Sequence, residues 1–234
     1  MFVEWTIPVL AAVVLHEVAH GLAARRLGGE LALAGGPLPD NPLRHVDIFG
    51  TIVLPALLII AGLRLPFGYA KTIRIDFSRF ARSRRDLVAV LAAGPAANLV
   101  LAIVAALALH AVGSLPDHVN GLAAIHDYRP DGWTVVVADN LMNMVRISIL
   151  LAAINIIPLP PLDGGRLAVE LLPTRLSALL ARLERYGLMI VVVVFFVLPL
   201  FGGQLGLGID PYDWIVSPIV ELFYNSLRVL SGHG

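Results

Sequence analysis

The stretch VVLHEVAHGLAARRLGG, residues 13–29, places two histidines and one glutamate inside an otherwise apolar segment. A charged side chain inside a membrane span costs about 2.5–3.5 kcal/mol by insertion scales, so ionisable groups kept there indicate a function. His16 and His20 are four residues apart and therefore share one face of a helix. This H-E-x-x-H pattern predicts two zinc-binding imidazoles with Glu17 as general base. The alternative is a pair of histidines that are hydrogen-bonded inside a helix bundle.

The composition is that of a membrane protein. Of the 234 residues, 58% are hydrophobic and only 15% are charged, whereas about 25% are charged in soluble domains. Membrane spans of roughly 20 apolar residues each account for the difference. The formal net charge is zero, so nucleic acid is not an expected partner. The chain has no cysteine, which excludes disulfides and thiolate metal ligands.

Apolar run length predicts an all-α polytopic membrane protein. Four spans are expected, at residues 2–24, 86–112, 135–157 and 187–203. Two further segments, 48–66 and 213–230, are ambiguous, which gives about five to six transmembrane or re-entrant segments around a three-helix catalytic core. The stretch 165–187 alternates apolar and basic residues at helical spacing. It is expected to lie at the membrane interface or to begin the next span.

No repeat or linker divides the chain, so residues 1–234 are predicted to form one domain. Its catalytic core is expected at about 2–170, followed by C-terminal helices in 171–234. Basic residues cluster in 25–44, 64–85 and 166–185, whereas 113–134 carries three aspartates and one arginine. The positive-inside rule therefore predicts a multi-pass protein of the cell membrane whose basic loops and active site face the cytoplasm. By the same rule, 48–66 is expected to dip into the membrane and return, or to lie against the core.

A catalytic zinc site needs a third protein ligand. The best candidate is Asp163 in NIIPLPPLDGG, residues 155–165, where prolines end the third span and two glycines follow the carboxylate. This position lies at the cytoplasmic end of its span, as the histidines do. Alternatively, Asp163 caps the next helix. Glu170 and Glu184 are the other downstream carboxylates, but neither lies in such a helix break.

Three motifs occur along the chain in the order HEVAH, GPAAN (residues 94–98) and NIIPLPPLDGG. In these motifs and in their order the sequence resembles the site-2 proteases, which are zinc metalloproteases that cut peptide bonds within the membrane. The resemblance covers roughly residues 10–170. NPLRHVDIFGTIVLPALL and FGYAKTIRID are similar to a small bacterial branch without PDZ or CBS domains, although Thr72 replaces the usual proline after FGYAK. The loop 113–134 is too short for a PDZ domain, and no regulatory domain is expected after residue 234.

The resemblance implies one Zn²⁺ per chain, bound by His16, His20 and Asp163, with Glu17 as general base. It also implies that Asn155 holds the substrate carbonyl, although capping of its helix end is an equal alternative. Asn98 of the GPAAN motif is expected to orient groups around the site or to position the substrate, helped by Gly94, Ala96 and Ala97, which allow close helix contact. A small strand-like piece near 68–77 is expected to receive an unwound substrate by strand addition.

These features predict intramembrane proteolysis of transmembrane protein or peptide substrates in the lipid bilayer. The alternative is a non-proteolytic membrane protein that binds or transports zinc with the same ligands. Transporters usually show repeated halves, which this sequence lacks, and a glutamate beside a ligand histidine has no obvious use in transport. The sequence therefore favours the protease.

Overall fold

A computed structural model of the chain describes part of its residues. These are residues 2–28, 33, 47–53, 75–76, 80, 83–111, 133–199, 201, 211, 213–214, 217–218, 221–222 and 225. Within them the structure is mostly helical, and three helices are long and apolar enough to cross a membrane. An all-α fold with several candidate spans is therefore confirmed for this part of the chain. The total of five to six segments remains a prediction.

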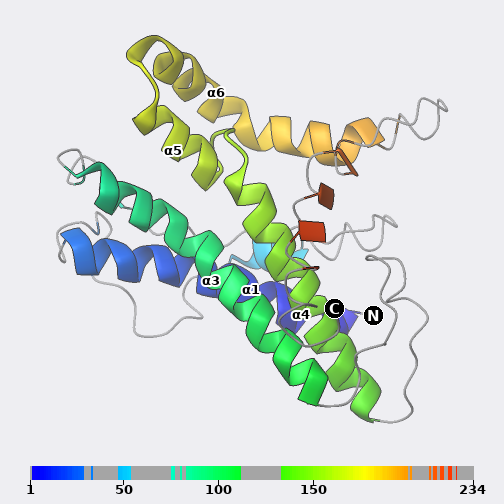
Figure 1. The fold of residues 1–234 in the computed structure, drawn as a ribbon. Coiled ribbons are helices and arrows are strands. Elements are labelled where there is room, and N and C mark those ends of the chain that lie inside the picture. The colour runs from blue at the N-terminus through cyan, green and yellow to red at the C-terminus, as the bar shows by residue number, and fades with distance from the viewer. Residues whose placement is uncertain are drawn as a thin grey trace.

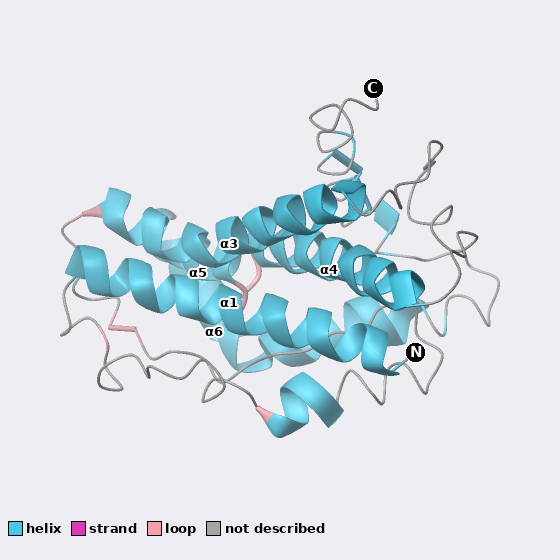
Figure 2. Ribbon diagram, turned by 90° about the horizontal axis from the view of Figure 1, so that it is seen from below, coloured by secondary structure: helices cyan, strands magenta, loops and turns pink. Residues whose placement is uncertain are grey.

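The three candidate spans form one bundle. They are α1 (Phe2–Gly28), α3 (Arg84–Ala111) and α4 (Trp133–Ile156), and each packs against the other two. Figures 1 and 2 show them side by side. Small buried side chains from all three helices contribute to the core between them, including Ala12, Ala102, Ala105 and Ala153. Small residues allow helix backbones to approach closely, which is typical of packing within a membrane.

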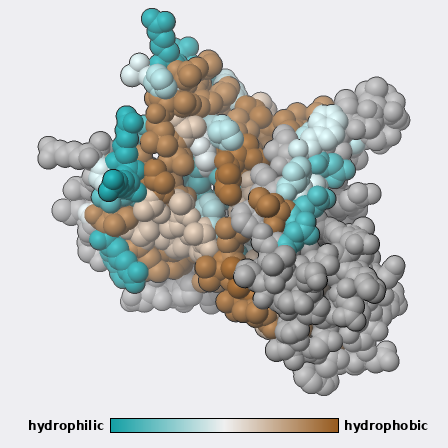
Figure 3. Space-filling model, in the orientation of Figure 1, coloured by the Kyte–Doolittle hydropathy of each residue, from teal (hydrophilic) through white to brown (hydrophobic). Residues whose placement is uncertain are grey.

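Each of the three helices extends beyond its predicted span at one end. Helix α1 continues through Arg25 and Arg26 in its last turn, and α3 begins at Arg84. A search for apolar runs leaves out such charged ends, although the basic residues in the last turn of α1 favour that helix end through the helix dipole. Apolar side chains cover much of the described surface of the bundle (Figure 3). Four of them, Ile7, Val100, Val104 and Leu107, are more than half exposed, as expected for helices surrounded by lipid.

The stretch 165–187 differs from the single helix expected there. It is divided between α5 (Asp163–Leu171) and α6 (Thr174–Val192). The break lies at Leu172, whose extended backbone is the conformation that a following proline imposes. Helix α6 continues directly into the π-helical turn η6 (Val193–Val197), so its later part begins the segment expected at 187–203. That this segment crosses the membrane remains a prediction.

The remaining expected elements lie mostly outside the described residues. Of the segment 48–66, the structure describes the short π-helix η3 (Ile48–Val53), which packs on α1. Of the strand-like piece near 68–77, it describes residues 75–76, and Ile75 forms an isolated antiparallel bridge with Leu33. Most of 213–230 is not described. The re-entrant segment and the strand therefore remain predictions.

Candidate metal centre

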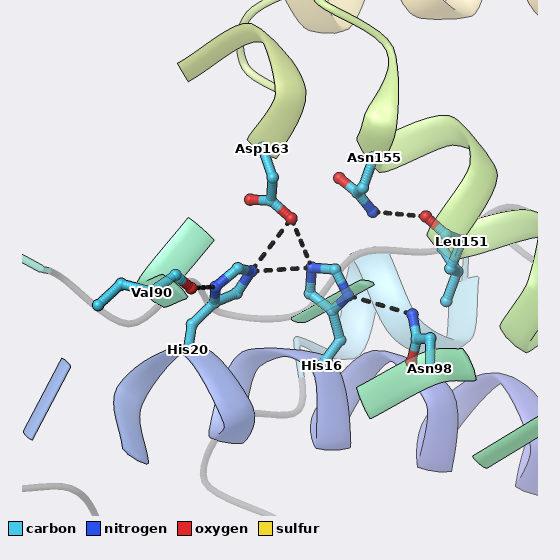
Figure 4. Close-up of polar contacts among 7 residues, drawn as sticks. All are labelled: His16, His20, Val90, Asn98, Leu151, Asn155 and Asp163. Atoms are coloured by element: carbon cyan, nitrogen blue, oxygen red, sulfur yellow. Dashed lines mark hydrogen bonds and ion pairs between the residues drawn. The ribbon is translucent and has the colours of Figure 1, made fainter. Parts of the chain in front are cut away.

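Both histidines of the H-E-x-x-H pattern lie on the face of α1 that points into the molecule. Figure 4 shows the two imidazoles side by side, and their Nε2 atoms are 3.1 Å apart. His16 is 7% exposed and His20 is 6% exposed. The helical spacing of four residues thus brings two nitrogen ligands to one point, as the sequence predicts.

Asp163 completes this group from the far end of the sequence. It is the first residue of α5, and its Oδ2 lies 3.0 Å from His16 Nε2 and 3.1 Å from His20 Nε2. The alternative role as a helix cap is wrong, because the residue at the cap position is Leu162 and the Asp163 carboxylate meets the histidines instead. Burial alone raises the pKa of this carboxyl, but hydrogen bonds from both histidines outweigh it and hold the pKa well below its usual range.

The three atoms fit a zinc ion. Nitrogen and oxygen ligands lie about 2.0–2.2 Å from zinc, so tetrahedral ligands are roughly 3.3 Å from one another. The three separations here are 3.0, 3.1 and 3.1 Å. Two imidazoles and one carboxylate also make the three-ligand set of a catalytic zinc site, which keeps its fourth position open. Among the described residues, His16, His20 and Asp163 are the group identified as able to hold a metal.

One face of α3 forms the third wall of this centre. Val90 and Asn98 lie four residues on either side of Gly94 and therefore share its face of the helix. The Val90 carbonyl accepts a hydrogen bond from His20 Nδ1 at 2.7 Å, and the Asn98 carboxamide lies 3.1 Å from His16 Nδ1. A Cβ on Gly94 would overlap both imidazoles. The close contact expected at Gly94 is thus a contact with the candidate ligands themselves.

The turn that carries Asp163 is packed equally closely. A Cβ on Gly164 would overlap the backbone of Ile156, and a Cβ on Gly165 would overlap that of Leu159. A Cβ on Gly187, in α6, would overlap the carbonyl of Pro160. Glycine is therefore required where the chain folds back behind the carboxylate.

Two expected catalytic residues lie beside this group. Glu17 is partly buried on α1, next to His16. Asn155 lies near the end of α4, and its Nδ2 donates a hydrogen bond to the Leu151 carbonyl at 2.9 Å (Figure 4). This hydrogen bond lies within α4 and resembles the alternative role predicted for Asn155, which is to cap the end of its helix. A carboxamide has two N–H donors, so one of them is not used by Leu151.

The other downstream carboxylates lie away from the centre. Glu170 and Glu184 are exposed on α5 and α6, respectively, and neither belongs to the metal-binding group. Sequence reasoning missed one contributor, the backbone carbonyl of Val90, because a main-chain atom leaves no signature in residue identity. The only signal near it was the GPAAN motif four residues later.

A buried pair of histidines and an aspartate, packed among helices able to cross a membrane, is the ligand set expected of a zinc enzyme in a membrane protein. The chain belongs to peptidase family M50, the site-2 protease family, whose model matches residues 5–198. The predicted family, zinc dependence and enzyme class are therefore confirmed: the protein is a zinc metalloprotease.

Two relatives illustrate this membership. The chain is 34% identical over 197 residues to YwhC of Bacillus subtilis, described as a candidate zinc metalloprotease, which covers 83% of this chain and 80% of that protein. It is 30% identical over 187 residues to Rip2 of Mycolicibacterium smegmatis, described in the same way, which covers 79% of this chain and 63% of that protein. No solved structure gives a significant match.

Proposed function

We propose that this protein hydrolyses peptide bonds in or near transmembrane segments of membrane proteins, at a zinc ion bound by His16, His20 and Asp163. One observation carries the proposal. Three ligand atoms from residues up to 147 positions apart meet at 3.0–3.1 Å in a buried site between candidate membrane spans. Burying two imidazoles and a carboxylate together is costly unless they are paired or bind a metal.

The chemistry follows from the residues around that point. A bound zinc supplies Lewis acidity, which makes water nucleophilic near neutral pH and polarises a carbonyl. Glu17 accepts a proton from the attacking water and returns it to the leaving amine as the C–N bond breaks and the new C–O bond forms. The remaining N–H of Asn155 donates to the developing oxyanion, and removal of such a donor costs about 2.7–4 kcal/mol in the barrier.

The substrate must present an unwound backbone, because the carbonyls of an intact helix are engaged in hydrogen bonds. The segment 68–77 receives this backbone as an added strand. Replacement of Ile73 by proline tests the step, since proline removes a backbone donor. The variant should lose cleavage of an unwound model peptide, and unchanged cleavage would contradict strand addition.

The protein is a multi-pass protein of the cell membrane with its active site toward the cytoplasm, an orientation that the clusters of basic residues support. His16 and His20 lie in the half of α1 that leads to Arg25 and Arg26. This position supports an active site in the cytoplasmic half of the membrane. The alternative of a zinc transporter is not favoured by membership of a peptidase family.

The decisive experiment compares wild-type protein with Glu17→Gln in detergent. Glu184→Gln is the matched control, because Glu184 is an exposed glutamate on α6. All three proteins should bind about one zinc per chain, but only Glu17→Gln should fail to cleave a model transmembrane substrate. Persistent cleavage by Glu17→Gln would remove the proposed base. Absence of zinc from all three proteins would refute the site.

A further inference from the structure

The two candidate histidine ligands share a second neighbour besides Asp163. In each imidazole Nε2 faces the carboxylate, and in each imidazole Nδ1 faces α3. His20 meets Val90 and His16 meets Asn98, so α1 and α3 run in opposite directions along this contact (Figure 4). Helix α3 therefore provides the partner of Nδ1, the nitrogen that faces away from Asp163, in both rings.

The protonation of His20 follows from its partner. A backbone carbonyl can only accept a hydrogen bond, so Nδ1 of His20 carries a proton. When a metal ion takes the place of the hydrogen bond between His20 Nε2 and Asp163, the neutral ring therefore offers the lone pair of Nε2. That lone pair is what a metal ion needs. Metal-binding histidines almost always donate their other N–H to a carbonyl or carboxylate, which fixes the tautomer and the ring orientation.

His16 needs the same arrangement, because its Nε2 also faces the carboxylate. Its Nδ1 must then donate, and the group that meets Nδ1 is the carboxamide of Asn98 at 3.1 Å. Asn98 is fully buried at 0% exposure, inside a span that is otherwise mostly apolar. A carboxamide buried in such a span needs a polar partner.

We propose that Asn98 is a positioning residue, which accepts the Nδ1 proton of His16 through its side-chain oxygen and so fixes His16 as an Nε2 ligand. The oxygen and nitrogen ends of a carboxamide have the same shape, and their assignment follows from the hydrogen bonds they make. With the nitrogen toward His16, Oδ1 is buried and has no hydrogen-bond partner in the described part of the chain. Turning the carboxamide end for end gives that oxygen the N–H of His16. The inference rests on the zinc site of the proposed function.

The test uses full-length protein in detergent with three variants. Asn98→Ala removes the carboxamide, and Asn98→Asp keeps an acceptor of the same shape without any donor. The matched control is Asn143→Ala, because Asn143 is a buried asparagine of α4 whose Oδ1 accepts a hydrogen bond from Arg146. Zinc affinity is measured by chelator competition, and the visible spectrum of bound Co²⁺ reports the ligand geometry.

Zinc affinity should fall about 10–100-fold in Asn98→Ala, as for other residues that orient metal ligands. The Co²⁺ spectrum of this variant should change. Asn98→Asp should bind zinc nearly as wild type does, and Asn143→Ala should not change zinc affinity. Equal losses in Asn98→Ala and Asn98→Asp would overturn the proposal, because the carboxamide would then act as a donor. So would wild-type affinity in Asn98→Ala.

Two further results separate this inference from the proposed function. If Asn98→Ala does not fold, the comparison of Asn98→Asp with wild type decides, and a tenfold loss of zinc affinity in it overturns the proposal. Wild-type protein that binds zinc but cleaves no transmembrane substrate refutes proteolysis, whereas the zinc affinities still test Asn98. Wild-type protein that binds no zinc refutes both.

Discussion

Replacement of Gly94 by alanine tests how closely α3 approaches the two imidazoles. A Cβ at this position would lie 2.6 Å from Nε2 and 2.7 Å from Cε1 of His16, and closer still to Nε2 of His20. Ordinary van der Waals contact begins at 3.4 Å, so the His16 ring would have to move by about 0.8 Å and the His20 ring further. Both rings are held from behind by hydrogen bonds to α3, so any such movement breaks or strains those bonds.

The expected effect on zinc binding is large. Zinc–ligand distances normally stay within about 0.2 Å of their usual values, which is far less than the movement that the new methyl group requires. Changes behind a ligand already weaken metal binding about 10–100-fold, and here the ligand atoms themselves are displaced. We therefore expect zinc affinity to fall at least about 100-fold, or about 2.8 kcal/mol. Alanine favours a helix interior over glycine by about 1 kcal/mol, so the metal-free variant should remain folded.

The assay measures zinc affinity by chelator competition, cleavage of a model transmembrane substrate, and thermal unfolding without zinc. Ala92→Val is the control, because Ala92 is exposed on the same helix. It should leave all three measurements near the wild-type values. Gly94→Ala should lose zinc and cleavage while its unfolding temperature is maintained. A folded Gly94→Ala variant with wild-type zinc affinity would refute the reasoning, because the imidazoles would then have room to move without loss of the metal.

Three other perturbations test separate parts of the structure. Asp163→Asn keeps the shape of the side chain but removes its charge, so zinc affinity should fall at least about tenfold, and unchanged affinity would exclude Asp163 as a ligand. Gly187→Ala places a methyl group against the Pro160 carbonyl and should destabilise the protein by about 1–3 kcal/mol, as measured by denaturant unfolding; wild-type stability would mean that α6 can shift. The chain has no cysteine, so single cysteines are specific labels. Arg85→Cys should react with a membrane-impermeant thiol reagent from the cytoplasmic side and Asp131→Cys from outside, and the reverse pattern would invert the predicted topology.

The helices of the bundle were predictable because a membrane span has a strong signature in sequence. About 20 predominantly apolar residues are needed to cross the hydrocarbon core, and α1, α3 and α4 are each long and apolar enough to do so. The break between α5 and α6 was harder to predict. The helical spacing of apolar residues continues across 165–187, and it outweighed the local signal of Pro173, which prevents a helical conformation at Leu172. Periodicity therefore predicted helical structure in this stretch but did not predict the break that separates α5 from α6.

The candidate ligands were predictable for a different reason. His16 and His20 are placed on one face by helix geometry alone, and the prolines before Asp163 mark a break in the helix where a side chain can turn inward. The contribution of α3 could not be predicted in this way. Gly94 indicates that some group lies close to α3, but it does not identify that group. The contacting residues depend on how α1 packs against α3. The Val90 carbonyl has no side-chain signal at all.

The position of Asp163 depends on residues that provide no ligand. Its carboxylate follows a turn whose backbone is packed against Gly164 and Gly165 from α5 and against Gly187 from α6. Because α6 touches this turn, a change in its packing moves the carboxylate relative to the two imidazoles, which are fixed separately by α3. The geometry of the centre thus depends on contacts on both sides, one behind the histidines and one behind the aspartate. The predicted division into a catalytic core at 2–170 and C-terminal helices at 171–234 therefore does not separate α6 from the chemistry.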